Sequence, residues 1–91
     1  MAGPNIEVVL PAALLRLFPA CPRELTLPAG SVAGMIAALD ARWPGMGDRL
    51  CDSTPRIRRH INIFVAGERA TLETELPPGA EVYIMTAISG G

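Results

Sequence analysis

The sequence predicts an α+β roll, in which one main helix covers one face of a mixed sheet of four or five strands. Two segments in which apolar residues recur at every second position open and close the chain, at residues 5–10 and 81–88. Between them, residues 32–43 carry an apolar stripe with helical spacing. A chain of 91 residues has room for one modest core, so a single domain over residues 1–91 is expected.

The first strand is predicted over residues 5–10, where Ile6, Val8 and Leu10 alternate with Asn5, Glu7 and Val9. Residues 11–23 contain three prolines and predict a loop, with one helical turn as an alternative. A short second strand is expected over residues 24–27, and it stops at the Pro-Ala-Gly run of residues 28–30.

The main helix is predicted to begin after Ser31, whose side chain can cap the free amide groups of the first turn. Apolar residues then recur at positions 32, 36, 39 and 43, which places them on one face. Pro44 and Gly45 end the helix. Residues 46–50 allow another short turn.

The second half of the chain predicts two further strands. Residues 57–65 are expected to form one, with Ile61, Ile63 and Val65 on its inner face, and residues 81–88 form the last. Tight turns are expected at residues 66–68 and 77–79, with at most another short strand in residues 69–76. The first and last strands are expected to pair in parallel in the middle of the sheet.

The composition argues against several classes of function. Eight basic and nine acidic residues leave a net charge of −1, which gives no strong field for nucleic acid or membrane binding. All eight basic residues are arginine, so the chain has no phosphate-binding lysine loop. The spacing of Cys21 and Cys51 matches no metal-binding motif and no disulfide framework, so neither a metal site nor a disulfide is expected. Free thiols and the absence of a leader pattern predict a cytoplasmic protein.

The sequence ends in Gly90-Gly91, which is the strongest functional signal. Glycine combines a minimal cross-section with full backbone freedom, so a diglycine end can pass through a narrow slot into another protein's active site. Its carboxylate is ionised and a poor electrophile, so it would need ATP-dependent activation by a partner. Residues 88–91 are expected to form a flexible tail that reaches about 13 Å when extended. An ordinary frayed end is the alternative.

Four segments together resemble the ThiS/MoaD sulfur carriers. Residues 82–91 (VYIMTAISGG) are similar to the last strand and tail of that family, and residues 77–82 (PPGAEV) to the turn before it. Residues 60–68 (HINIFVAGE) resemble its hairpin, with Ala66 in place of the usual asparagine. Residues 28–32 (PAGSV) resemble the start of its main helix. The resemblance covers the chain from about residue 24 to the end, by the order and spacing of these motifs.

The resemblance implies a β-grasp, ubiquitin-like fold and a carrier that is not itself an enzyme. An E1-like enzyme would use ATP to adenylate Gly91, which becomes a thiocarboxylate that donates sulfur to an acceptor enzyme. The chain itself would bind no cofactor. Its length resembles that of the longer family members, such as the small subunit of molybdopterin synthase or the carrier of cysteine synthesis. Molybdopterin synthesis is expected, with the large subunit of molybdopterin synthase as the acceptor. Sulfur donation to cysteine or thiamin synthesis, conjugation of Gly91 to other proteins, and an inert binding module are the alternatives.

A partner-binding surface is expected beside the tail. Phe64, Tyr83 and Met85 fall on the strand faces opposite the inner residues, and Ile88 and Ser89 lead into the diglycine. We expect these residues to dock the activating enzyme, with burial under the loop of residues 11–23 as the alternative.

A basic cluster precedes the third predicted strand and contains Arg56, Arg58, Arg59 and His60. It is interpreted as a solvated surface, with electrostatic steering of an acidic partner as a further hypothesis.

Overall fold

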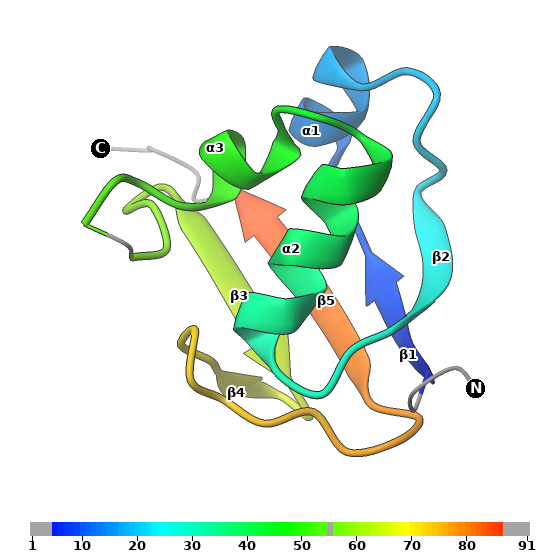
Figure 1. Cartoon of the computed structure of the whole chain (residues 1–91), viewed down its shortest axis with the longest axis vertical. Helices are drawn as coiled ribbons and strands as arrows, with labels where there is room; N and C mark the ends of the chain where they lie inside the picture. Colours follow the sequence, from blue (N-terminus) through cyan, green and yellow to red (C-terminus); the bar gives the residue numbers. More distant parts are fainter. Residues whose placement is uncertain (1–4, 55, 87–91) are drawn as a thin grey trace.

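The described residues, 5–54 and 56–86 of the computed structural model, form a five-stranded mixed sheet with helices on one face (Figure 1). The strand order is β2-β1-β5-β3-β4. The elements in chain order are β1 (Asn5–Val9), α1 (Ala12–Leu17), β2 (Glu24–Pro28), α2 (Val32–Arg42), α3 (Met46–Leu50), β3 (Ile61–Val65), β4 (Glu68–Arg69) and β5 (Glu81–Thr86). The predicted α+β roll with one main helix is confirmed.

The expected parallel pair is also confirmed, because β1 and β5 lie side by side in the middle of the sheet with Val8 opposite Val82. All other neighbouring strands are antiparallel. Two further backbone hydrogen bonds fix the start of this pair: Glu7 N–H donates to the Ala80 carbonyl (2.9 Å), and Gly79 N–H donates to the Asn5 carbonyl (2.8 Å). The first and last strands are therefore joined directly.

A single hydrophobic core lies between the sheet and the helices. Alternate strand residues point into it, and α2 contributes the turn-by-turn stripe that its sequence predicts. The buried residues of the strands and of α2 are Ile6, Val8, Leu27, Val32, Met35, Ile36, Leu39, Ile61, Ile63, Val82 and Ile84. Trp43, expected on the helix stripe, is only half-buried at the helix end.

The N-terminus of α2 is held by the segment that follows β4. The Ser31 hydroxyl accepts a hydrogen bond from Gly34 N–H (3.0 Å), as expected for the capping residue. The free amides of Val32 and Ala33 donate to the backbone carbonyls of Thr74 (3.0 Å) and Leu72 (3.1 Å). These bonds satisfy amides that have no partner within the helix, and they fix residues 70–76 beside α2.

The junction between α2 and α3 depends on Asp40. One oxygen of its carboxylate accepts hydrogen bonds from Gly45 N–H (3.1 Å) and Gly47 N–H (2.9 Å). Gly45 has a φ of 99°, a conformation that L side chains rarely adopt. The chain therefore reverses within three residues, and Met46 and Leu50 of α3 are buried in the core.

Three element boundaries differ from the sequence-based expectation. Residues 11–23 contain α1, six residues long, so the alternative of a helical turn is correct; its Leu14 is buried in the core. The third strand begins at residue 61 and not at 57, because Arg58 N–H bonds back to the Leu50 carbonyl (2.9 Å) and Ile61 N–H to the Arg58 carbonyl (2.9 Å), which forms a turn. The short fourth strand lies at residues 68–69, so it begins in the expected turn and only Arg69 falls within the expected range of 69–76.

The β3–β4 hairpin turns through two residues with positive φ, Ala66 (53°) and Gly67 (82°). This is the two-residue turn whose twist matches that of the flanking strands. Glycine adopts such a conformation freely, whereas alanine places its Cβ against the backbone. Ala66 is exposed, so no packing contact explains its presence there.

We predict that Ala66→Asn stabilises the protein by about 0.5–1 kcal/mol, because asparagine tolerates the left-handed conformation better than alanine. The free energy of unfolding, measured by urea denaturation, checks this prediction. The matched control is Ala66→Val, whose branched side chain should destabilise the same turn. A lower stability for the asparagine variant would contradict the assignment of strain to this residue.

Candidate functional site

The outer face of the sheet exposes large apolar side chains from the central strand. In β5, Val82 and Ile84 are buried beneath the helices, whereas Tyr83 and Met85 point the opposite way and are 45% and 50% exposed. Helices cover only the inner face of the sheet (Figure 1). The alternation predicted for the last strand therefore divides it between a core face and a free face.

Neighbouring strands extend this apolar surface on both sides of β5. Phe64 of β3 lies directly opposite Tyr83, and Val9 of β1 is paired with Tyr83 from the other side. Met85 lies two residues after Tyr83 on the same face of β5, opposite Asn62. Phe64 and Val9 are half-buried by their neighbours. We name Val9, Phe64, Tyr83 and Met85 the outer-face patch.

The structure brings together the three residues that the sequence singled out, Phe64, Tyr83 and Met85, and adds Val9. Val9 was identified as an off-core residue of the first strand, and only the β1–β5 register places it beside Tyr83. The alternative, burial of the patch under residues 11–23, is wrong for the described part of the chain. That segment packs on the inner side, with Leu14 and Cys21 in the core.

The described part of the chain ends with β5. Thr86, the last described residue, is paired with Ile61 of β3. The predicted site residues Ile88, Ser89, Gly90 and Gly91 lie outside the described residues. The described structure therefore ends in a central strand that carries an apolar patch on its outer face, and the predicted site residues follow this strand in the sequence.

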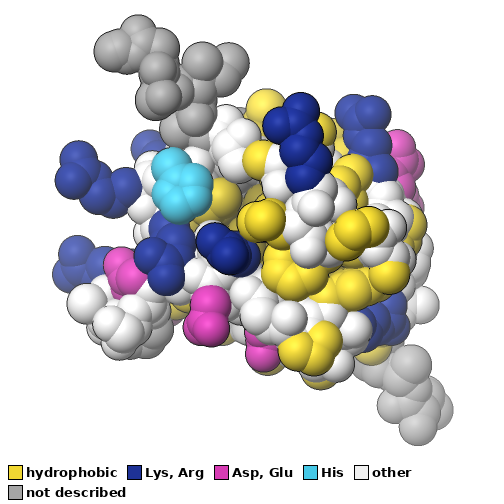
Figure 2. Space-filling model, turned by 90° about the horizontal axis from the view of Figure 1, so that it is seen from above, with side chains coloured by type: hydrophobic (Ala, Val, Ile, Leu, Met, Phe, Trp, Pro, Cys, Tyr) yellow, Lys and Arg dark blue, Asp and Glu magenta, His cyan; other side chains and the backbone are white. Residues whose placement is uncertain are grey.

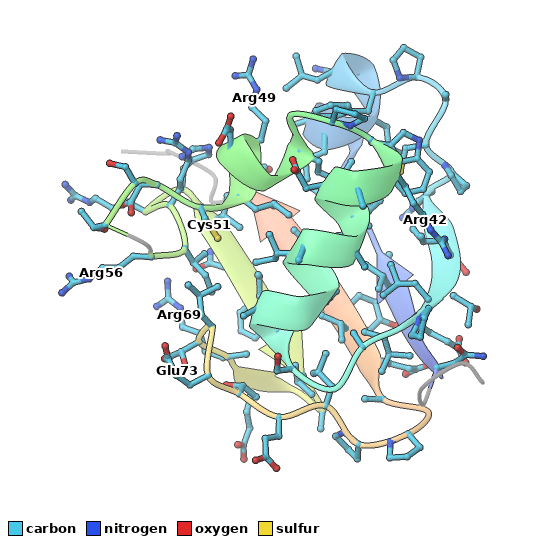
Figure 3. The ribbon with its side chains drawn as sticks, in the orientation of Figure 1. Arg42, Arg49, Cys51, Arg56, Arg69 and Glu73 are labelled. Carbon is cyan, nitrogen blue, oxygen red and sulfur yellow. The ribbon has the colours of Figure 1, made fainter. Side chains whose placement is uncertain are left out.

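The basic cluster lies near the same end of the sheet, in the loop that precedes β3. Together with Arg69 of β4, Arg56, Arg58 and Arg59 line a shallow groove of about 410 Å³. Figure 3 shows Arg56 and Arg69 on the same side of the molecule, with Glu73 close to Arg69. His60 is exposed and lines a different hollow, beside Phe18 and Arg49.

Asp52 holds the loop that carries Arg56. Its carboxylate accepts hydrogen bonds from the Thr54 hydroxyl, from Thr54 N–H (2.9 Å) and from Arg56 N–H (3.0 Å). These bonds favour the ionised form, so the pKa of Asp52 lies below its ordinary value. The carboxylate is therefore a structural acceptor at neutral pH.

The remaining candidate groups do not form a catalytic or metal site within the part of the chain that the structure describes. Burial raises the pKa of the Cys21 thiol, and burial together with the nearby Asp52 charge raises that of Cys51, so neither is an activated thiolate at neutral pH. No group of three potential metal ligands occurs among these residues. None of the described helices has the length and apolar character needed to cross a bilayer.

Comparisons with known proteins found similar solved structures but no similar sequences. No protein-family model matches the chain, and no curated protein sequence matches it. Among solved structures, the crystal structure of the Amycolatopsis orientalis BexX/CysO complex contains a chain that is 26% identical. That match has a TM-score of 0.81 and covers 94% of this chain and 99% of that one.

Two further structures match over similar lengths. Mycobacterium tuberculosis CysO is 25% identical, with a TM-score of 0.80 over 91% of this chain and 99% of that one. SAMP1 from Haloferax volcanii is 24% identical, with a TM-score of 0.79 over 96% and 99%, a likeness that shows the fold. With these neighbours, the resemblance found in the sequence is confirmed for the fold: the chain has the ThiS/MoaD-like, ubiquitin-like β-grasp fold of CysO and SAMP1.

Proposed function

We propose that this chain is a sulfur carrier whose Gly91 carboxylate is converted to a thiocarboxylate by a partner enzyme. The observation that carries the proposal is the position of β5. This strand is central in the sheet, it exposes Tyr83 and Met85, and it leads within five residues to Gly90-Gly91. A candidate docking surface and a sterically minimal end therefore follow one another closely in the sequence.

The proposed chemistry has two steps, both carried out by an E1-like partner. First, a carboxylate oxygen of Gly91 attacks the α-phosphorus of ATP, and pyrophosphate leaves. Hydrosulfide then attacks the acyl carbon, the bond to the adenylate oxygen breaks, and AMP and a proton are released. The chain itself supplies the carboxylate and the docking surface and catalyses neither step. It contains no lysine and no phosphate-binding loop sequence, so ATP binding is assigned to the partner.

The outer-face patch is proposed as the docking surface for that enzyme. An exposed tyrosine and methionine, flanked by the half-buried Phe64 and Val9, offer apolar area that gains free energy when a partner removes it from water. Ile88 and Ser89 would extend the contact towards the diglycine.

The acceptor of the sulfur is the open part of the proposal. Chain length alone favoured molybdopterin synthase, and the solved neighbours lend that choice no support, because they are CysO and SAMP1. The BexX/CysO complex, in which CysO is bound to another protein, supports the general scheme of a small carrier that works with a partner. A sulfur acceptor enzyme outside molybdopterin synthesis is therefore an equal candidate.

Conjugation of Gly91 to other proteins is the second candidate function. Small archaeal modifier protein 1 from Haloferax volcanii shares the fold, with a TM-score of 0.80 at 22% identity. A modifier needs the same activated diglycine, and only the final nucleophile differs: an amine in place of sulfide. This chain has no lysine, so it offers no lysine side chain for conjugation to a second copy.

We predict that incubation with ATP, the cognate activating enzyme and sulfide raises the intact mass by about 16 Da, because sulfur replaces one carboxylate oxygen. Mass spectrometry of the whole protein measures this gain. Deletion of Gly91 should abolish it without changing the thermal unfolding temperature. Covalent adducts on other proteins, with no gain of 16 Da, would favour the modifier, and no reaction of either kind would overturn the proposal.

We predict that Met85→Asp weakens binding to the activating enzyme by about tenfold or more, because a charge would enter the centre of an apolar contact. Leu17→Asp is the matched control, since Leu17 is a similarly exposed apolar residue (51%) on α1, away from the patch. Isothermal titration calorimetry compares the two variants. Equal affinities for Met85→Asp and the unchanged protein would reject the patch as the docking surface.

A further inference from the structure

A second surface, distinct from the outer-face patch, lies beside the β3–β4 edge of the sheet. Two segments that are distant in the sequence, residues 56–59 and 69–73, form the sides of a groove of about 410 Å³. Four of the chain's eight arginines line it: Arg56, Arg58, Arg59 and Arg69. In the space-filling view of Figure 2, several arginine side chains lie close together beside the histidine, at the left of the view, and others lie at the top and at the lower right.

The positive charge of this arginine groove is largely uncompensated by its own lining. Glu73 is the one acidic residue that lines it, against four guanidinium groups. The Nε–H of Arg58 donates to the Asp48 backbone carbonyl (2.6 Å), and Arg69 donates to the side-chain oxygen of Asn62. Both acceptors are neutral, so these bonds orient the guanidinium groups without neutralising them. The Asp52 carboxylate, which does not line the groove, interacts with the charge of Arg58 and offsets part of it.

The floor of the groove is apolar. Ile61, Ile63 and Ala70 are buried beneath it, and Ile57 and Leu72 are half-buried at its surface. A floor of this kind with a cationic rim suits a ligand that combines carboxylates with an apolar side chain. A nucleic acid fits less well, because the whole chain has a net charge of −1 and a phosphate backbone offers no apolar anchor.

We propose that the arginine groove binds an acidic segment of a partner protein, anchored by an apolar side chain on the groove floor. Ile61, which lines the groove, is paired with Thr86 at the end of β5. The groove therefore lies near the end of the sheet from which the chain continues towards Gly91. If the proposed function holds, the partner is the enzyme that acts on Gly91, and the acidic segment is its second contact beside the outer-face patch.

The first test uses a peptide and does not depend on the carrier function. A fluorescein-labelled peptide of sequence Asp-Glu-Asp-Leu-Ile-Glu-Asp-Glu is titrated with the full chain, and fluorescence anisotropy gives its Kd. A twin peptide replaces every acid by its amide, and a single-stranded RNA of about 12 nucleotides tests the nucleic acid alternative. Shifts of the backbone amides in a ¹⁵N-labelled sample locate the binding site.

Charge-reversed variants connect binding to the groove. Arg56→Glu with Arg59→Glu reverses two exposed groove arginines, and Arg23→Glu with Arg42→Glu makes the same charge change at exposed positions outside it. We expect about a tenfold or greater loss of peptide affinity for the first variant and less than about a twofold change for the second. Arg56→Gln with Arg59→Gln should give an intermediate loss, which separates charge from folding defects.

The outcomes are decisive in both directions. Binding of the acidic peptide that weakens between about 0.05 and 0.3 M salt, with amide shifts at Ile57 and Leu72, supports the proposal. No saturable binding at about 1 mM peptide, equal binding of the amide twin, equal losses in both charge-reversed variants, or tighter binding of RNA overturns it.

The second test uses the activating enzyme and separates the two proposals. If the unchanged chain gains the thiocarboxylate but the groove variant binds the enzyme as tightly as the control variant, the assignment of the enzyme as the groove's partner fails and the carrier function stands. If the unchanged chain is not activated at all, the carrier function fails, and the peptide test still decides whether the groove binds acidic segments.

Discussion

The parallel pairing of β1 with β5 is the constraint on which the rest of this fold depends. It places Val8 opposite Val82 and makes β5 the middle strand, with hydrogen-bonded neighbours on both sides. A slip of one residue in this register would exchange the two faces of β5, so that Tyr83 and Met85 would enter the core and Val82 and Ile84 would face solvent. The buried core and the exposed patch are therefore two consequences of a single register.

The described surface divides into regions of different chemistry. The outer face of the sheet is apolar at its centre, whereas the groove beside the β3–β4 edge combines arginine side chains with an apolar floor. Neither region contains an activated thiolate or a cluster of metal ligands among the described residues. Apolar and mixed surfaces of this kind suit contacts with other proteins, which is the role proposed for both regions.

Much of the fold could be predicted because local signals and tertiary packing agree. The Ser31 cap, the apolar stripe of α2 and the alternation in β1 and β5 each match the structure. The start of the third strand could not be predicted, because no glycine, proline or asparagine in residues 57–60 marks the turn that backbone bonds to α3 and to β3 form there. The arginine groove could be predicted only in part. The cluster that contains Arg56 is visible in the sequence, but Arg69 lines the same groove only because of the tertiary fold. The α1 helix was obscured by the prolines around it.

The central position of β5 also has a mechanical consequence. When an enzyme grips the residues after Thr86 and pulls along the strand, the load is shared by the hydrogen bonds to β1 and to β3 at once. The bonds to β3 lie across the direction of pulling and those to β1 are slanted across it, so both sets resist sliding of the strand, whereas an edge strand would have one such set. Under the proposed function, a partner would act on the end of this chain while two sets of hydrogen bonds hold its last described strand in the sheet.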